Sequence, residues 1–194
     1  MIKSSKTSIY TLTGKEWEII PNIAYRMMSF VMTLADLIKN YSNKNFNTLN
    51  LKYGQTVVDY GCGPARYIEN ASKTVGKYGK VIAVDIHPLA IKNVKRKIEK
   101  YQLKNVEAIL ASGYTTPIDS KIADVVYALD MFHMIHRPNE LLKELSRLIK
   151  DDGIIIIEDG HQSRNETKQK IESVGILNII EETKSHVKCK KYEK

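Results

Sequence analysis

The short stretch from residue 59 to residue 65 carries the strongest sign of chemistry in this sequence. It reads Asp-Tyr-Gly-Cys-Gly-Pro-Ala, so the acidic Asp59 is followed by Gly61 and Gly63. Glycine permits a sharp turn and lets the backbone approach a ligand where a Cβ atom would collide. Such a turn before a helix presents unpaired backbone N–H groups and the positive end of the helix dipole. The stretch therefore predicts a loop that can seat a carboxylate or a phosphate.

A second acidic residue, Asp85, follows at the end of the apolar run 81–84 (Val-Ile-Ala-Val). A carboxylate at the end of such a strand, roughly twenty residues after a glycine turn, can accept hydrogen bonds from ribose hydroxyl groups. The dehydrogenase form of this pattern has a small residue at the position that Arg66 occupies here. The pattern therefore disfavours a dinucleotide cofactor.

The elements that must position these residues alternate between strands and helices. Val57 and Val58 form a β-branched run that suits a parallel strand buried on both faces. Helices are expected at 67–75, closed by Gly76 and Gly79, and at 88–101, opened by Pro88 and lying between two strands. This alternation predicts βαβ units and a parallel sheet.

The second half of the chain continues the alternation. Strands are expected at 106–110, 123–129 and 154–157, and a helix at 139–149. Ser163 and Glu166 have the spacing of a capping box, which predicts a helix that ends near Gly175. The segments 177–182 and 187–192 are expected to form an antiparallel hairpin.

An amphipathic helix is expected from Pro21 onward. An apolar stripe recurs at spacings of three and four residues, and we expect it to face the domain. Its members are Ile20, Ile23, Met27, Val31, Leu34 and Ile38, widened by Phe30 and Leu37.

Residues 57–67 resemble motif I of the class I S-adenosylmethionine-dependent methyltransferases, because an acidic residue precedes Gly-x-Gly-x-Ala. Residues 81–86 resemble the family's next motif, and the resemblance extends from about residue 51 to residue 191. It implies an α/β fold: a Rossmann-like, doubly wound, mostly parallel seven-stranded sheet with a C-terminal antiparallel hairpin and an N-terminal helical extension. A single domain is expected over 1–194, with the extension at 1–50 and the Rossmann-like core at 51–194.

The resemblance also implies the cofactor, S-adenosyl-L-methionine, and the residues that hold it. Asp59 and the turn that follows would hold the methionine end, Asp85 the ribose and Ile86 the adenine ring. Ser112 stands where many members carry an Asp that binds the adenine amino group. The full set of expected cofactor-binding residues is Asp59, Tyr60, Gly61, Cys62, Gly63, Asp85, Ile86, Ser112, Gly113 and Leu129.

In the small-molecule methyltransferases that the chain resembles, an N-terminal segment often covers the acceptor site. The helix after Pro21 would then be a lid, with Trp17, Tyr25, Met27 and Met28 facing the acceptor. The alternative is that this helix only covers an edge of the core.

The acceptor should meet the residues that follow the fourth and fifth strands, because ligands collect at the carboxyl ends of parallel strands. His161 is the best-placed general base, with Asp159 and Glu158 as alternatives. His133 and His136 would need further ligands to hold a metal ion, and none is suitably spaced, so no metal is expected.

Composition restricts the class of protein. Two cysteines, Cys62 and Cys189, form neither a disulfide framework nor a zinc cluster, which fits a cytoplasmic protein. No apolar stretch is long enough to span a membrane, and no membrane partner is expected. The net charge of +8 could indicate nucleic acid, but the densest run of Lys and Arg falls in the helix at 88–101, as on a solvated helix face.

The sequence therefore predicts transfer of a methyl group from S-adenosylmethionine to a small-molecule acceptor. An RNA methyltransferase and a catalytically inactive S-adenosylmethionine-binding protein remain as alternatives, and an NAD-dependent oxidoreductase ranks last because of Arg66. The Asn-Pro-Pro-Tyr signature of amide and adenine nitrogen methyltransferases is absent after the fourth strand, where the chain reads Leu-Asp-Met-Phe at 129–132.

Overall fold

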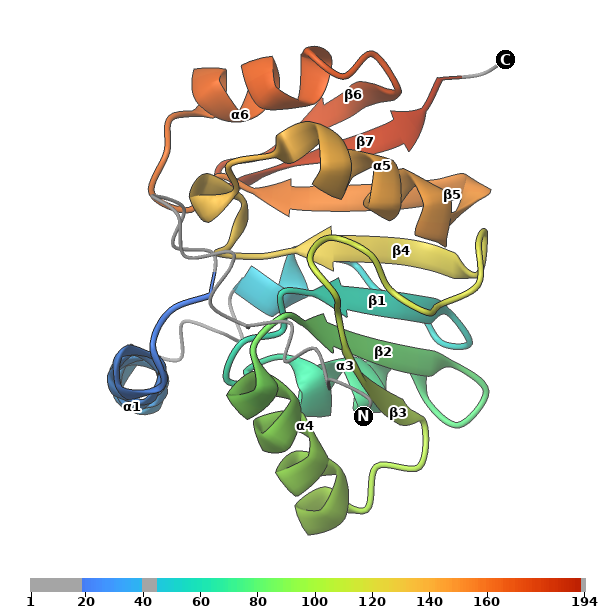
Figure 1. The fold of residues 1–194 in the computed structure, drawn as a ribbon. Helices are drawn as coiled ribbons and strands as arrows, with labels where there is room; N and C mark the ends of the chain where they lie inside the picture. Colours follow the sequence, from blue (N-terminus) through green and yellow to red (C-terminus); the bar gives the residue numbers. More distant parts are fainter. Residues whose placement is uncertain (1–18, 40–44, 193–194) are drawn as a thin grey trace, which may run out of the picture.

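A seven-stranded sheet forms the centre of the computed structural model, which describes residues 19–39 and 45–192 (Figure 1). The strands are β1 (Thr56–Tyr60), β2 (Lys80–Asp85), β3 (Val106–Leu110), β4 (Ala123–Ala128), β5 (Ile149–Glu158), β6 (Leu177–Glu182) and β7 (His186–Lys191). The helices are α1 (Asn22–Lys39), α3 (Ile68–Val75), α4 (Pro88–Tyr101), the short 3-10 helix η2 (Phe132–Met134), α5 (Pro138–Leu148) and α6 (Arg164–Glu172).

The strand order is β3-β2-β1-β4-β5-β7-β6. The first five strands in this order pair in parallel, while β7 runs antiparallel to both β5 and β6. The expected Rossmann-like fold with an antiparallel hairpin at the far edge is therefore confirmed. The order reverses between β1 and β4, and in open α/β sheets ligands bind at such a point, beyond the carboxyl ends of the strands.

The two faces of the sheet are covered by different helices. Alternate residues of one strand point to opposite faces, so Val57 packs with α3 and α4 whereas Val58 packs with α5 and α6. The central strands are buried on both faces and consist mainly of Val, Ile and Ala. This double cover holds the carboxyl ends of β1, β2 and β4 in fixed positions at one edge.

Several boundaries differ from those expected. The strand predicted at 154–157 begins at Ile149, because Ala123 pairs with Ile149 before the register shifts so that Val125 pairs with Ile154. The polar residues 150–153 are accommodated in this irregularity of the ladder. The helix after Ser163 is confirmed with its cap, since the Ser163 hydroxyl accepts from the Glu166 N–H, but it ends at Glu172 rather than near Gly175.

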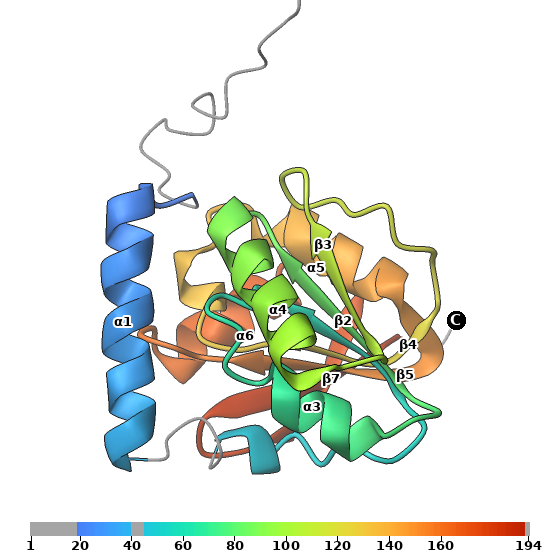
Figure 2. The same cartoon turned by 90° about the horizontal axis from the view of Figure 1, so that it is seen from below.

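Helix α1 lies across the carboxyl edge of the parallel strands, set apart from the helices that cover the sheet (Figures 1 and 2). The expectation that its apolar stripe faces the domain is wrong. Ile23, Met27 and Val31 are 75%, 66% and 62% exposed, and Phe30, Leu34, Leu37 and Ile38 are exposed as well. The helix instead turns Tyr25, Met28 and Met32 inward, because polar contacts at both of its ends fix its rotation.

Candidate functional site

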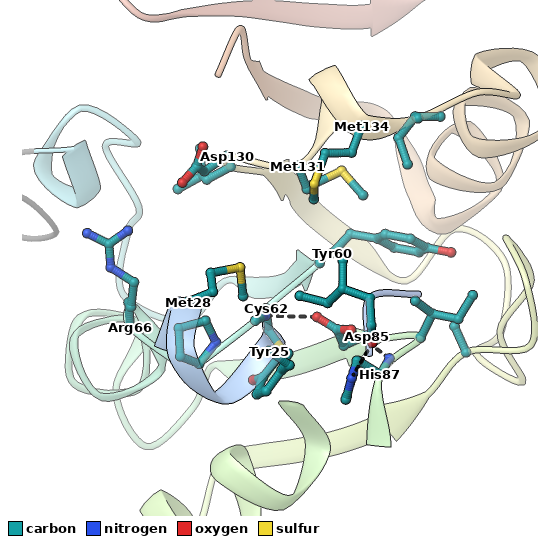
Figure 3. A pocket seen from close by; sticks show the side chains of 18 of the residues that line it. Tyr25, Met28, Tyr60, Cys62, Arg66, Asp85, His87, Asp130, Met131 and Met134 are labelled. Carbon is teal, nitrogen blue, oxygen red and sulfur yellow. Dashed lines mark hydrogen bonds between the residues drawn. The ribbon is translucent and has the colours of Figure 1, made fainter. Parts of the chain in front are cut away.

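One pocket opens at the carboxyl edge of the sheet, between α1 and the segment that follows β4 (Figure 3). Tyr25 and Met28 of α1 lie on the same side as Cys62 and Asp85, while Asp130, Met131 and Met134 lie on the opposite side. The pocket thus brings the glycine loop together with residues from α1 and from the β4 end.

The glycine loop at 61–63 makes the sharp turn that the sequence predicts. Gly61 and Gly63 have φ angles of +83° and +48°, which side chains rarely adopt. The expected row of unpaired N–H groups is not found, however. The N–H groups of Gly61 and Cys62 both donate to the Val84 carbonyl, at 2.8 and 2.9 Å. Strand β2 therefore accepts hydrogen bonds from the Gly61 and Cys62 amides, which the sequence pattern predicted to be available for an anion.

Asp85 fixes the loop from the end of β2. Its Oδ2 accepts from the Gly63 N–H and its Oδ1 from the His87 N–H, both at 2.8 Å (Figure 3). Burial raises the pKa of Asp85, and the two backbone donors oppose that shift. The carboxylate lies in the wall of the pocket while it orients the loop.

Asp59 lies beneath the loop and does not line the pocket. Its side chain is 2% exposed, and its Oδ2 has no hydrogen-bond partner within the described part of the chain. Burial, and then the nearby charge of Asp85, raise the pKa of Asp59 to about 8. The buried position therefore favours the protonated form of this carboxyl group.

His87 joins α1 to the core. Its Nδ1 accepts from the Leu89 N–H and caps α4, so the remaining ring proton lies on Nε2, which is 3.1 Å from the Ile20 carbonyl oxygen. The Tyr25 ring stacks on the His87 ring with centroids 4.3 Å apart, and Asn93 donates to the Tyr25 hydroxyl. These contacts fix Tyr25 in the wall of the pocket, where it is buried.

Arg66 provides the second attachment of α1. Its guanidinium group binds both carboxylate oxygens of Asp36. Arg66, which the sequence marks as unsuitable for a dinucleotide, thus connects the glycine loop to α1, which contributes Tyr25, Met28 and Met32 to the pocket lining.

The structure gathers most of the expected cofactor residues around this pocket. Those that line it are Tyr60, Gly61, Cys62, Gly63, Asp85, Ile86, Gly113 and Leu129. Asp59 and Ser112 do not line it; Ser112 instead forms a backbone bridge with Thr115. His161 is exposed and also lies outside the pocket lining.

Among the residues proposed to face an acceptor under the lid interpretation, Tyr25 and Met28 line the pocket, whereas Met27 is exposed and Trp17 lies outside the described residues. Met131 lies in the segment after the fourth strand that was expected to face the acceptor, and it lines the pocket. Sequence reasoning missed Met32 and Met134, which add further apolar surface. It also missed His87, although Pro88 at the first helical position places the residue before it at the N-cap.

Asp130 and His161 lie close to His133, a grouping that the spacing of residues in the sequence did not reveal. Potential ligand atoms of Asp130, His133 and His161 lie within 4.8 Å of one another, because β4 and β5 are neighbours and end at the same edge. His136, the partner considered from spacing, is not a member of this cluster. Burial, and to a lesser extent His161 and Lys170, lower the pKa of His133, while Asp130 opposes this shift.

Glu158 is a buried acid at the end of β5. Its Oε1 accepts from the Asn45 side chain at 2.9 Å, while its Oε2 has no hydrogen-bond partner among the residues that the structure describes. Burial and the charge of Asp130 raise the pKa of Glu158 to about 7.

The sheet order, the glycine loop with Asp85 and the pocket at the switch point define a Rossmann-like cofactor-binding domain. The profile of a family described as "Methyltransferase domain" matches residues 51–192. The chain therefore belongs to the methyltransferase domain family, whose cofactor here is S-adenosylmethionine.

Relatives and solved structures agree with this assignment. Demethylmenaquinone methyltransferase of Bacillus cereus is 28% identical over 120 residues, which are 61% of this chain and 50% of the relative. This chain thus spans about half the length of the curated relatives it matches. A SAM-dependent methyltransferase from Aquifex aeolicus is 26% identical with a TM-score of 0.64, over 76% of this chain and 87% of that one.

The fold is also shared with a TehB-like SAM-dependent methyltransferase from Corynebacterium glutamicum, at 14% identity and a TM-score of 0.70, over 88% of this chain and 100% of that one.

Within the described residues, no helix combines the length and the hydropathy that crossing a membrane requires.

Proposed function

We propose that this chain transfers a methyl group from S-adenosylmethionine to a small, largely apolar acceptor. The observation that carries the proposal is the pocket itself, which joins the glycine loop to apolar side chains from α1 and from the β4 end. A small molecule can be enclosed there next to the cofactor. We also propose that residues 51–192 form one domain to which α1 is attached as a lid.

The cofactor would lie along the loop and the end of β2. Gly61 and Gly63 leave room for the methionine part because neither has a Cβ atom. Asp85 would accept from the ribose hydroxyl groups with the lone pairs that Gly63 and His87 leave unused. Ile86, Gly113 and Leu129 would contact the adenosine part, while Asp59 would act from below by supporting the loop. Ser112 would contribute through its backbone rather than its side chain.

The acceptor would lie between Tyr25 and Met28 on one side and Met131 and Met134 on the other. Methionine side chains adapt their shape to an apolar or aromatic partner. The name of the Bacillus cereus relative, demethylmenaquinone methyltransferase, supports an apolar acceptor of this kind.

The chain's catalytic task would be to hold the acceptor in line with the transferred group. Bound S-adenosylmethionine supplies an electrophilic methyl group, so orientation provides most of what the protein must add. Tyr25 and Met28 would press the acceptor toward the loop and keep water out. We do not assign the base role to His161, since it is exposed and outside the pocket lining.

An RNA substrate is a weaker candidate. A polynucleotide would have to pass α1, which is attached across the pocket through Arg66 and His87. The net charge of +8 remains the feature that favours RNA, and binding that weakens steeply with salt would identify it.

Calorimetric titration with S-adenosylmethionine, S-adenosylhomocysteine and NAD tests the cofactor, followed by a panel of small phenolic and quinol acceptors. We expect micromolar binding of the first two, weakened at least tenfold by Asp85→Ala and unchanged by Glu107→Ala, an exposed acid on β3. Product formation would support the proposal. Binding without product from any acceptor would favour the inactive cofactor-binding protein, and no binding would contradict both.

A further inference from the structure

Two histidines and one aspartate converge beside the pocket from loops that are distant in sequence. Asp130 follows β4, His133 lies in η2, and His161 lies in the turn after β5. One potential ligand atom from each residue lies within 4.8 Å of the other two. The rings of His133 and His161 meet edge to face, with centroids 4.9 Å apart.

The backbone at Gly160 is shaped around His133. Gly160 has a φ angle of +62°, and a Cβ atom built there would lie 2.2 Å from the His133 Nδ1. Only glycine therefore lets the turn after β5 pass this close to the imidazole ring. The same turn carries His161 to the cluster.

The cluster contains a polar atom that the protein itself does not satisfy. The Nδ1 of His133 is buried without a hydrogen-bond partner among the described residues. Leaving a buried polar atom unpaired destabilises the folded protein. A metal ion bound through this nitrogen would supply the missing partner.

We propose that Asp130, His133 and His161 bind a divalent transition metal ion, Zn²⁺ or a metal of similar character, at the edge of the pocket. Two imidazole nitrogens and one carboxylate oxygen suit such borderline metals better than Mg²⁺ or Ca²⁺, which prefer all-oxygen sites. Bonds of about 2.0–2.2 Å would draw the three donors closer together than they are now. The exposed side chain of His161 can make this adjustment.

Three protein ligands leave at least one coordination position open, as in catalytic rather than structural zinc sites. Asp130 lines the pocket as well as belonging to the cluster. The open position can therefore take an oxygen donor that enters the pocket. If the proposed function holds, that donor is a hydroxyl group of the acceptor, and the metal would both orient it and lower its pKa. The existence of the metal site does not depend on this role.

Titration of tag-free protein with Co²⁺, followed by displacement with Zn²⁺, tests the site in the absence of cofactor and acceptor. We expect one Co²⁺ ion per chain with the visible absorption of nitrogen ligation, and a change in that absorption when azide is added. Losing a residue that only orients a ligand reduces metal affinity roughly 10–100-fold, so losing a ligand should cost at least about tenfold.

His161→Ala and Asp130→Asn are the informative variants. His161 is exposed, so its replacement removes no core packing, and Asn tolerates the φ angle of +53° at position 130. His136→Ala, an exposed histidine outside the cluster, is the matched control and should bind as wild type. The proposal is overturned if the wild type shows no saturable binding, or if His161→Ala and Asp130→Asn bind as tightly as the wild type. An absorption spectrum that azide leaves unchanged would overturn the open coordination position.

The same experiment separates this site from the proposed function. His161→Ala should bind S-adenosylhomocysteine as the wild type does, since His161 does not line the pocket. Loss of metal binding with intact cofactor binding confirms that two distinct sites are involved. Loss of both in this variant would show that His161 supports the pocket instead of holding a metal ion.

Discussion

Arg66 and Asp36 form a two-pronged ion pair between the glycine loop and α1. The Arg66 Nε donates to Oδ2 at 2.7 Å and Nη2 donates to Oδ1 at 2.6 Å, with side chains only 10% and 19% exposed. Charge-assisted pairs with this geometry are stronger than single hydrogen bonds between neutral groups. The ion pair couples the loop to the helix, so a substitution that weakens it should change the stability of α1.

Asp36→Asn should loosen α1 without unfolding the sheet. The amide keeps the shape of the carboxylate but cannot accept both donors, and we expect a local loss of about 1–3 kcal/mol. Hydrogen exchange measured by mass spectrometry should speed up across Asn22–Lys39 and stay unchanged in β1 and β4. Asp151→Asn, which breaks an exposed pair with Lys121, is the control and should leave α1 protected. Unchanged exchange in α1 would show that the ion pair does not hold the helix.

Two substitutions of His87 should separate its two tasks. His87→Asn keeps a side chain that can cap α4 but loses the stack on Tyr25 and the contact with Ile20. His87→Phe keeps an aromatic ring for Tyr25 but loses the cap, at a cost of about 1 kcal/mol. It also loses the contact with Ile20, because a phenyl ring has no N–H, so the two variants differ in the cap and the stack alone. Urea denaturation should therefore show the larger loss for His87→Phe, while exchange in α1 should increase more for His87→Asn. If exchange in α1 increased more for His87→Phe than for His87→Asn, the stack on Tyr25 would contribute little to holding the helix.

Asp59 should make the stability of the ligand-free protein depend on pH. Its folded-state pKa of about 8 lies above its ordinary value of 3.8, so the folded protein binds more protons than the unfolded chain between these values. The contribution of this group to the free energy of unfolding falls as pH rises through that window and levels off above it.

Asp59→Asn removes this titration. The free energy of unfolding of the variant, minus that of the wild type, should increase with pH between about 4 and 8 by up to about 1.4 kcal/mol per pH unit. Urea denaturation at a series of pH values measures the difference. Parallel curves for the two proteins would show that Asp59 is ionised in the folded state.

Gly61→Ala should both strain the loop and crowd the pocket. The φ angle of +83° is unfavourable for alanine, and the new Cβ atom would lie 2.8 Å from the Met131 Cγ. We expect a loss of stability of about 1–3 kcal/mol and weaker binding of S-adenosylhomocysteine. Adding Met131→Ala should restore part of the affinity by removing the clash, but should leave the backbone strain. Full recovery in the double variant would mean that the strain is negligible.

The sequence predicted the bounds of helices and strands best where residues typical of turns stand at both ends of the element. Helix α4 at Pro88–Tyr101 and strand β6 at Leu177–Glu182 match the predicted ranges, because turns bound them on both sides. The rotation of α1 was not predictable in this way. Its periodicity was correct, but the contacts of His87 and Asp36, rather than the burial of its stripe, decide which face points inward.

Long-range neighbours account for the remaining errors. The Val84 carbonyl accepts hydrogen bonds from two amides of the glycine loop, and this contact depends on the register between β1 and β2. The meeting of Asp130 with His161 likewise depends on the pairing of β4 with β5. Neither relation leaves a trace in the local spacing of residues, which is the only signal that a single sequence offers.

The close approach of Gly160 to His133 has an evolutionary consequence. A side chain at position 160 and an imidazole at position 133 exclude each other, since the Cβ atom would overlap the ring nitrogen. In homologous chains, histidine at position 133 should therefore be found only where glycine occupies position 160. The converse does not hold, because the φ angle of +62° favours glycine in this turn whichever residue stands at position 133. Loss of the cluster in a lineage would therefore be recorded at positions 130, 133 and 161 before it is recorded at position 160.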